Sequence, residues 1–416
     1  MQIGSRVRSD YHGSMEPTYD VLIVGGGLVG ASLAIALDRI GMEVGMVEAT
    51  PSGELPTVFD QRNLSFAAAT VNALSALGVM SKLRAPTGPI RRIHVSREGD
   101  FGRVWLDAAD YGRDSFGQVV VARDFGEALE TRLAELPRLT RYRPARCIGV
   151  EPVADGFRGL RIASADGERR LRARLVVGAD GTRSAVRELL HIDTEEHDYF
   201  QTLFVARVRA ARAPDGTAWE RFGEHGPTAL LPRGDRHFGV VHGVARDQAA
   251  TVAALDEASW LARLQQAIGW RAGRLLASGE RSAYPLVQVL AKSLLAERVV
   301  LVGNAAQTVH PVGAQGFNLG LRDALTLAEL IEHDRSDVGA AHLLSAYVQQ
   351  RQPDREQTVE FSRGLARLTA NPSPLLRPLR SAGLLAASQV AGLQARLVGG
   401  AMGFRGEVPR LCRSTS

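Results

Sequence analysis

Apolar residues in this chain gather in short runs that predict buried strands joined to helices. The first run, residues 21–24, is continuous, and it leads through a glycine-rich turn into apolar positions at helical spacing over residues 31–40. Residues 43–47 form a second strand-like run. Continuous apolar strands are typical of parallel sheets that are covered on both faces. The start of the chain therefore predicts a βαβ unit.

Two later runs end in glycine turns in the same way. Residues 175–181 read LVVGADG, and residues 299–304 read VVLVGN. The second of these runs leads through the sequence QGFN into a predicted helix over residues 319–333. Further strands of the parallel sheet are therefore expected in the middle of the chain and in its last third.

A different pattern separates these later runs. Apolar and polar residues alternate in the stretches 203–209, 228–231 and 238–244, which predicts antiparallel strands. Because runs of the parallel sheet lie before and after them, we expect the antiparallel sheet to be inserted into the first domain. The predicted fold class is α/β, with a Rossmann-type domain, an inserted antiparallel sheet and C-terminal helices. The predicted boundaries are 1–18 for a flexible N-terminal extension, 19–90, 120–195 and 285–350 for the Rossmann-type domain, 91–119 and 196–284 for the inserted domain, and 351–416 for a helical, basic and apolar extension.

The first glycine turn has the spacing of a dinucleotide-binding fingerprint. Gly25 allows the tight turn, Gly27 lets a pyrophosphate approach the backbone, and Gly30 lets the helix pack closely on the strand. Glu48 ends the second strand, 18 residues after the last of these glycines, where an acid accepts hydrogen bonds from ribose hydroxyls. An acid at this position repels a 2′-phosphate. The pattern therefore favours FAD or NAD over NADP.

Composition narrows the class of protein. With 416 residues and 45% hydrophobic content, the chain can bury a large core. Its two cysteines, Cys147 and Cys412, lie far apart, no His/Cys cluster has the spacing of a metal site, and no Ser-His-Asp arrangement indicates a hydrolase. The sequence shows no secretory signal and no run of 18 or more apolar residues. We therefore expect a cytoplasmic protein.

Positive charge is concentrated in the C-terminal tail. Residues 361–416 contain eight arginines and a single acid, Glu407, whereas the whole chain carries a formal charge of +5. Leucines and valines alternate with these arginines. One interpretation is a helix packed on the main domain with a solvated basic face. The other is an amphipathic segment that holds the protein at the inner membrane or against other proteins. Nucleic-acid binding is not expected, because no reader motif accompanies the charge.

Two further motifs distinguish FAD from NAD. Residues 178–187 read GADGTRSAVR, and residues 303–311 read GNAAQTVHP. Together with the first glycine turn, they resemble the three fingerprints of FAD-dependent monooxygenases of the p-hydroxybenzoate hydroxylase type. The resemblance implies that Asp180 contacts the middle of FAD and that Asn304 contacts its ribityl chain. Asn304 stands where the family usually has aspartate, and an amide can still donate and accept hydrogen bonds.

Motifs in the second half of the chain narrow the resemblance. Residues 222–232 read FGEHGPTALLP, residues 281–286 read RSAYPL, and residues 313–324 read GAQGFNLGLRDA. Over residues 19–355 the chain resembles the FAD-dependent hydroxylases of ubiquinone biosynthesis, and among them most the 2-polyprenyl-6-methoxyphenol hydroxylases. The resemblance implies that NAD(P)H reduces FAD, that O2 then forms a flavin hydroperoxide, and that this species hydroxylates the ring of a polyprenylated phenol.

The same resemblance implies the remaining site residues. The motifs FDQRNLS and GQVVVARD place Arg62, Gln118 and Arg123 at the cofactor, and the later motif GAQGFN places a helix N-terminus beside the flavin. The full set of predicted cofactor-binding residues is Gly25, Gly27, Gly30, Glu48, Arg62, Gln118, Arg123, Asp180, Asn304, Gly316 and Asn318. The predicted substrate pocket contains His242, Tyr284, His310 and Pro311. No catalytic residue and no metal ligand is predicted.

Two alternative hypotheses stay open. One is a hydroxylase of the same fold that acts on a small soluble phenol or at another ring position, which product analysis would distinguish. The other is a non-catalytic scaffold of a quinone-biosynthesis assembly, whose purified protein would be colourless and would not take up FAD. The intact first glycine turn favours an enzyme over a scaffold.

Overall fold

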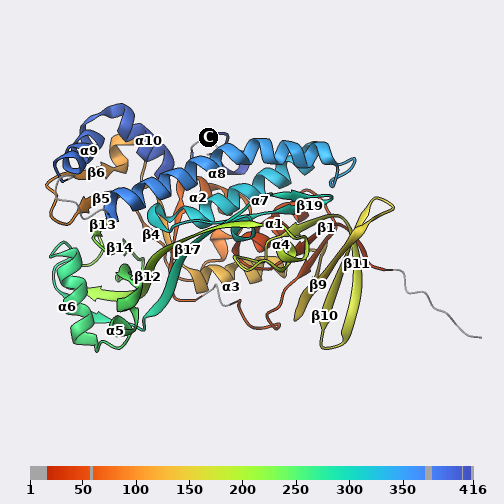
Figure 1. The fold of residues 1–416 in the computed structure, drawn as a ribbon, viewed down its shortest axis with the longest axis horizontal. Helices are drawn as coiled ribbons and strands as arrows, with labels where there is room; N and C mark the ends of the chain where they lie inside the picture. Colours follow the sequence, from red (N-terminus) through yellow and green to blue (C-terminus); the bar gives the residue numbers. More distant parts are fainter. Residues whose placement is uncertain (1–15, 57–59, 371–376, 405, 414–416) are drawn as a thin grey trace, which may run out of the picture.

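Three sheets with helices around them form the fold of the computed structural model, which describes residues 16–56, 60–370, 377–404 and 406–413 (Figure 1). Most of the predicted N-terminal extension, residues 1–15, lies outside the described residues. The first sheet occupies one end of an elongated molecule, and the second sheet occupies the other end. The division into domains stays a prediction, but the strand order shows which segments pair.

The first sheet has the parallel centre that the apolar runs predict. Its order is β18-β19-β11-β1-β2-β8, in which only β18 at the edge runs antiparallel to its neighbour. Val21, Leu22 and Ile23 in β1 are fully buried, as expected for a strand covered on both faces. β9 and β10 add an antiparallel extension to β11. The strands are β1 (Thr18–Val24), β2 (Val44–Val47), β8 (Leu139–Tyr142), β9 (Ala145–Ala154), β10 (Phe157–Ser164), β11 (Gly167–Gly178), β18 (Leu295–Ala296) and β19 (Val299–Leu301).

Helices from three parts of the chain pack around this sheet. They are α1 (Leu28–Arg39), α2 (Ala68–Ala76), α3 (Ala122–Leu133), α4 (Ala185–Leu189), α7 (Gln315–His333) and α8 (Ala341–Ala370). A small third sheet, of order β3-β7-β4, joins them and consists of β3 (Asn63–Ala67), β4 (Gly88–Pro89) and β7 (Gly117–Val121). Short 3-10 turns lie at η1 (Met80–Lys82), η2 (Ala108–Tyr111), η3 (Arg246–Gln248), η4 (Gly303–Ala305), η5 (Val312–Ala314) and η7 (Arg410–Cys412).

The second sheet is mainly antiparallel and is covered on one face by α5 (Ala249–Ala253) and α6 (Glu257–Ile268). Its order is β20-β17-β12-β15-β14-β13-β5-β6, with β16 also paired to β12 and with β13 and β5 parallel. Trp260 of α6 is 1% exposed and packs against Phe204 of β12 in a core separate from that of the first sheet. The strands are β5 (Arg92–Arg97), β6 (Arg103–Asp107), β12 (Thr194–Ala210), β13 (Thr217–Gly223), β14 (Gly226–Pro232), β15 (Phe238–Ala245), β16 (Leu275–Ser278), β17 (Ser282–Ala291) and β20 (Gln307–Thr308).

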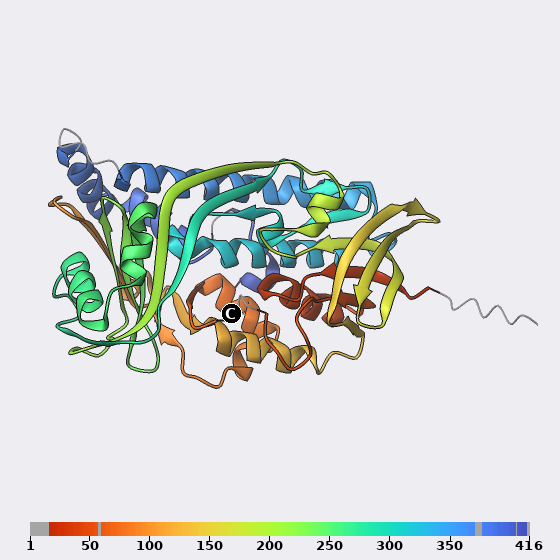
Figure 2. The same cartoon turned by 60° about the horizontal axis from the view of Figure 1, so that its bottom comes forward.

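Two long strands of the second sheet, β12 and β17, extend toward the first sheet (Figure 2). β12 is 17 residues long and pairs with β17 over residues 194–198 and 202–205, with a register shift between Asp198 and Thr202. Phe200, inside this interruption, has a positive φ of 54°. Beyond it, β17 pairs with β20, which directly follows the third glycine turn. The ribbon of β12 and β17 therefore runs from the second sheet to the third glycine turn, with one interruption in its pairing.

The C-terminal segment is not a simple appendage. α8 is one helix across residue 351, so the predicted boundary at that position divides a single element. After α9 (Arg377–Gln389) and α10 (Ala391–Ala401), the chain returns to the first core, where Cys412 is 1% exposed. Asn72 of α2 donates a hydrogen bond to the Cys412 carbonyl at 3.1 Å. Within the described residues, no helix is both long enough and apolar enough to cross a membrane.

Three of the eight tail arginines have described side chains, and all three bind protein groups. Arg363 pairs with Glu195 at 2.6 Å. Arg410 pairs with Glu329 at 2.8 Å, and Arg413 donates to the Val408 carbonyl at 3.0 Å. The side chains of Arg367, Arg377, Arg380, Arg396 and Arg405 lie outside the described residues. For the three arginines that can be followed, the basic character neutralises or caps neighbouring groups of the domain.

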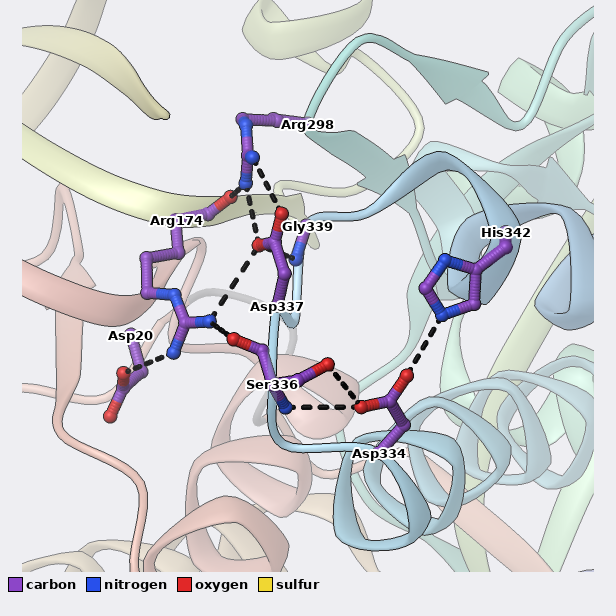
Figure 3. A network of polar contacts seen from close by, with 8 residues as sticks. All are labelled: Asp20, Arg174, Arg298, Asp334, Ser336, Asp337, Gly339 and His342. Carbon is purple, nitrogen blue, oxygen red and sulfur yellow. Dashed lines mark hydrogen bonds and ion pairs between the residues drawn. The ribbon is translucent and has the colours of Figure 1, made fainter. Parts of the chain in front are cut away.

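A polar network fastens the loop between α7 and α8 to the first sheet (Figure 3). Arg298 binds both carboxylate oxygens of Asp337, at 2.8 and 2.7 Å, and also the Arg174 carbonyl at 3.0 Å. Arg174 in turn donates to Asp20 at 3.4 Å and to the Ser336 carbonyl. These contacts join β1, β11 and the loop, so the start of α8 is held against the sheet edge.

Candidate functional site

One large cavity, of about 1450 Å³, is lined by both sheets and by the C-terminal helices. Its lining includes all three predicted glycine turns and the apolar face of the second sheet that α5 and α6 leave uncovered. Ligand pockets usually occupy roughly 300–1,000 Å³. The cavity is therefore large enough for a dinucleotide and a second ligand together.

The first glycine turn touches the second one. Gly25 has a φ of +104°, and a Cβ atom there would lie 2.5 Å from the Ala179 carbonyl oxygen. A Cβ atom on Gly30 would lie 1.9 Å from the Gly25 carbonyl oxygen. Gly27 is the N-cap residue of α1 and lines the cavity. Glycine is thus required for backbone packing at two of the three positions, and α1 presents its N-terminus to the cavity.

Glu48 lies where the sequence predicts a ribose-binding acid, at the end of β2. Its carboxylate accepts hydrogen bonds from the backbone N–H of Gly26 at 2.7 Å and from that of Thr50 at 2.8 Å. The side chain is 9% exposed and lines the cavity. Each oxygen holds one backbone donor and retains a further lone pair for a ligand hydroxyl.

Asp180, in the second glycine turn, has an unused acceptor. Its Oδ2 accepts from the Val186 N–H at 3.1 Å, whereas Oδ1 is buried without a hydrogen-bond partner among the described residues. Burial raises the pKa of this carboxyl group. Unsatisfied buried acceptors are rare because they are energetically unfavourable. An unsatisfied oxygen on a residue that lines the cavity fits a ligand hydroxyl, as FAD would supply.

The third glycine turn is held by a buried carboxylate. Asn304 lines the cavity from η4, and the side chain of Asp323 accepts from the Gly303 N–H at 3.3 Å and from Gln307 at 2.6 Å. Asp323 is itself paired with Arg351 at 2.8 Å. The position of Asn304 thus depends on an ion pair between α7 and α8.

The N-terminus of α7 also faces the cavity. Residues 313–317 line it, and the N-cap residue, Ala314, has a left-handed φ of 52°. The first N–H groups of a helix have no partner within the helix and carry partial positive charge. Gly316, in this first turn, leaves the backbone accessible. The arrangement fits the stabilisation of negative charge on a reduced flavin ring.

Arg62 and Tyr284 both line the cavity and share a partner that sequence reasoning missed. Arg62 pairs with Asp60 at 2.8 Å and lies over the Tyr284 ring at 4.3 Å. The Tyr284 hydroxyl donates to the same carboxylate. Burial raises the pKa of Asp60, but the hydrogen bonds from Arg62 and Tyr284 outweigh it, so this pKa is lowered overall. Predicted cofactor and substrate residues therefore meet in one cluster.

The cavity lining does not include four of the predicted cofactor residues, which are Gly30, Gln118, Arg123 and Asn318. Gln118 accepts a hydrogen bond from Thr87 at 2.9 Å, and Arg123 is paired with Glu127 on α3 with 63% of its side chain exposed. Asn318 is 2% exposed and its Oδ1 accepts from the Ala67 N–H at 3.0 Å. Asn318 also donates to the Ser65 and Ala314 carbonyls, so it ties the start of α7 to β3. Its role in this structure is to position that helix.

His242 lies on the opposite face of the second sheet from the cavity. Its ring bonds Thr228 at 2.8 Å and Arg263 at 3.0 Å, and it meets Trp260 edge-on. Burial, together with the nearby Arg263 charge, lowers its pKa to about 4. The placement of His242 in the substrate pocket is therefore corrected. Its neighbour Val241 lines the cavity instead, because successive side chains of a strand point to opposite faces.

His310 and Pro311 differ in their placement. Pro311 lines the cavity. His310 is 2% exposed, does not line the cavity and packs edge-on against Tyr199 at 4.7 Å between ring centres. Burial lowers its pKa to about 4. His310 is therefore a neutral packing residue behind the pocket wall.

Glu220 is a cavity residue that sequence reasoning missed. It lies on β13 between Ala218 and Phe222, and all three line the cavity. The period-two alternation of this strand was the signal that could have revealed it, since an acid there falls on an apolar face. In the described part of the chain, no group of three or more His, Cys, Asp or Glu side chains could hold a metal ion.

Comparisons with known proteins agree with this geometry. The family described as FAD binding domain matches residues 18–362. The chain is 35% identical over 408 residues to ubiquinone hydroxylase UbiL of Rhodospirillum rubrum, covering 96% of this chain and 94% of the relative. It is 30% identical over 404 residues to 3-demethoxyubiquinol 3-hydroxylase of Escherichia coli, covering 94% of this chain and 99% of the relative. Its fold is similar to that of p-nitrophenol 4-monooxygenase PnpA of Pseudomonas putida, with a TM-score of 0.77, 19% identity, and coverage of 94% and 100%.

Proposed function

This chain belongs to the FAD binding domain family, and from that premise we propose that it hydroxylates the aromatic ring of a polyprenylated phenol in ubiquinone biosynthesis, with O2 and NAD(P)H as co-substrates. The observation that carries the proposal is a single cavity shared by three glycine turns and the apolar face of a second sheet. A dinucleotide cofactor and an apolar substrate would meet there.

FAD, when bound, supplies the redox and oxygen chemistry of the reaction. The residues that would hold it are those that line the cavity at the glycine turns: Gly25, Gly27, Glu48, Arg62, Asp180, Asn304 and Gly316. Glu48 and Asp180 offer acceptors to hydroxyl groups, and Arg62 offers a planar fork of donors. The N-terminus of α7 supplies positive potential where negative charge accumulates.

The rest of the cavity suits a prenylated ring. Apolar side chains of β5, β6, β13, β14 and β15 line one wall, and α9 and α10 contribute Leu384, Ala387 and Leu397 to another. Such walls exclude water from the reacting ring, which protects reactive intermediates from hydrolysis. The continuation of the cavity under α9 and α10 favours a substrate with a hydrophobic chain over a small soluble phenol.

Loss of the chain is expected to cause accumulation of a prenylated phenol that lacks one ring hydroxyl. We would remove it from its host, extract the lipids, and identify the quinone precursor by mass spectrometry. Restoring the intact chain should return the quinone to its normal level, whereas a flavin-free variant should not. Normal quinone synthesis without the chain would contradict the substrate assignment, and full rescue by the flavin-free variant would favour a scaffold.

We also propose that the surface around α9 and the β5–β6 loop contacts an anionic membrane. Phe101 in this loop is 77% exposed, and its N–H donates to Ser381 of α9 at 3.3 Å. Leu385 and Val390, in and just after α9, are each 49% exposed. Exposed apolar side chains on a basic segment are typical of proteins that bind at a lipid surface. A prenylated phenol dissolved in the membrane would then reach the cavity wall formed by the same helices.

Removing apolar side chains from this surface should weaken vesicle binding. The double substitution Phe101→Ser and Leu385→Ser is expected to reduce cosedimentation with phosphatidylglycerol-containing vesicles about tenfold or more, since each buried side chain contributes roughly 1.5–3 kcal/mol. Trp270→Ser, at another residue that is 69% exposed, serves as the control and should bind as the unmodified protein does. Equal binding by all three proteins would exclude this surface.

A further inference from the structure

Glu220 is the one carboxyl group that the second sheet contributes to the described cavity lining. Its cross-strand neighbours are Ala229 on β14 and Val95 on β5. The next pairs outward on the same face are Val241 with Ala229 and Val104 with Val95. Every one of these neighbours is apolar and lines the cavity. The carboxyl group therefore projects from an otherwise apolar wall.

No side chain among the described residues bonds to this carboxyl group, and no charge compensates it. Elsewhere in the lining, Glu48, Asp180 and Arg183 lie at or beside the glycine turns, Glu54 lies in the loop after β2, and Arg146 lies in β9. Arg322 of α7 and Asp354 of α8 are bonded to each other at 2.7 Å, and Arg62 is bonded to Asp60. The strands β5, β6, β12, β14 and β15 contribute only apolar lining side chains.

The helices packed over this wall contribute no described charge either. The lining residues of α9 and α10 are Leu384, Ala387, Leu397, Gly400 and Ala401. The side chains of Arg377, Arg380 and Arg396 in these helices lie outside the described residues. Glu220 is partly buried, and a carboxyl group held in apolar surroundings without a partner is unfavourable. Such a group is retained where a ligand supplies the missing partner.

We propose that Glu220 binds the ring hydroxyl of the substrate and accepts its proton during hydroxylation. This inference rests on the proposed function, because it assumes a phenolic substrate. The O–H bond of the phenol breaks, its electron pair stays on the phenol oxygen, and the proton passes to a Glu220 carboxylate oxygen. The ring thereby becomes more electron-rich, as an aromatic ring must be to attack an electrophilic oxygen. When the product leaves the cavity, Glu220 releases the proton to solvent.

The protonation of Glu220 suits this role. Burial raises the pKa of its carboxyl group from 4.5 to about 7. A proton acceptor is most effective when its pKa lies near the working pH. Below pH 7 the group is a neutral carboxylic acid, and above it the group is a carboxylate that can receive the phenol proton. The hydroxylation rate should therefore rise with pH through about 7 and then level off.

Glu220→Gln tests the proton-accepting role. The amide keeps the shape and can still accept a hydrogen bond, but it cannot take up a proton. We expect kcat for ring hydroxylation to fall on the order of 10²-fold or more, with a small change in KM, and the rise of the rate near pH 7 to disappear. Glu224→Gln, an exposed acid at the end of the same β-hairpin, is the matched control and should leave the pH profile unchanged.

A pair of ligands tests the binding role without turnover. The probes are a phenol carrying one isoprene unit and the methyl ether of the same phenol, each titrated by the change that it causes in the flavin spectrum. The unmodified protein should prefer the phenol to the ether by about 10- to 100-fold above pH 7, as expected for a hydrogen bond to a charged group. Glu220→Leu should bind both probes with similar affinity.

The outcomes separate this inference from the proposed function. If the unmodified protein hydroxylates no prenylated phenol, the proposed function fails. If it does so and Glu220→Gln shows the same kcat and pH profile, only the inference about Glu220 fails. If the variants lose flavin, the unmodified protein still tests the inference. Its preference for the phenol over the ether should then increase as the pH rises through 7. A preference that is independent of pH would overturn the inference.

Discussion

Gly30→Ala is expected to abolish flavin binding. The added Cβ atom would lie 1.9 Å from the Gly25 carbonyl oxygen and 3.1 Å from its carbon, and both are backbone atoms. Gly25 cannot move away, because its own position is already limited by the Ala179 backbone. α1 would therefore be displaced from β1, and the N–H groups at its start would no longer point toward the pyrophosphate. Purified Gly30→Ala protein should be colourless, with less than about a tenth of the normal bound flavin, a tenfold loss being the effect of 1.4 kcal/mol.

The control for this experiment is Gly364→Ala. A Cβ atom at Gly364, in α8, meets no atom within 4 Å. Alanine also stabilises a helix relative to glycine by about 1 kcal/mol. This variant should keep its flavin absorbance in full. A Gly30→Ala protein that retained the same flavin content as Gly364→Ala would show that the first glycine turn is not the phosphate site.

Arg351→Met is expected to lower the free energy of unfolding by roughly 3–5 kcal/mol, the usual effect of removing one partner from a buried ion pair. Arg351 is 1% exposed and binds Asp323 at 2.8 Å and Asp354 at 2.7 Å. Without it, two buried carboxylates lose a cation that both of them contact. Urea unfolding followed by circular dichroism would measure the change.

The same substitution should also weaken FAD retention, because Asp323 holds the third glycine turn through the Gly303 N–H. Arg410→Met provides the comparison, since Arg410 is 60% exposed and its pairs with Glu329 and Glu332 lie at the surface. Exposed pairs contribute about 1 kcal/mol or less. Equal destabilisation by the two substitutions would contradict the buried-network interpretation.

The parts of the fold that the sequence predicts are those set by local patterns. Residues 21–24 and 175–178 form parallel strands because continuous apolar runs can be buried on both faces, and each ends at a glycine whose turn leads to the cavity. Glu48 and Asp180 could be placed for the same reason, since Glu48 directly follows β2 and Asp180 lies two residues after the end of β11. The end of a strand in a parallel sheet has a fixed location relative to its neighbours.

The predicted site residues that do not line the cavity differ from the others in the direction of their side chains. His242 belongs to a correctly predicted strand, but its face depends on register, and a shift by one residue exchanges the two faces. Gln118 lies on β7, and its partner Thr87 directly precedes β4, the strand that pairs with β7. Asn318 was expected at the flavin because its motif lies there, yet its amide is used to hold α7 against β3. Such choices among partners are decided by tertiary packing.

The C-terminal tail shows the same limit on a larger scale. Its basic and apolar composition predicts a surface helix, and α9 and α10 are helical. Composition does not reveal that Val408 and Cys412 return to the first core, since their burial depends on the surface offered by α2. Glu220 was missed because its neighbours in sequence are both polar and apolar. Such an acid does not stand out as a site residue until the face of the strand that lines the cavity is known.

The ribbon formed by β12 and β17 has a consequence for exchanging substrate specificity between relatives. A chimaera that exchanged only the inserted sheet would need junctions inside the paired strands β12 and β17. Each junction breaks backbone hydrogen bonds, and the host protein must supply new partners for these donors and acceptors. The interruption between Asp198 and Thr202 is where the fewest of these bonds cross. Chimaeras joined at that point should fold with the second sheet of a relative. Junctions placed at the ends of the strands would separate that sheet from the β-ribbon that positions it over the cavity.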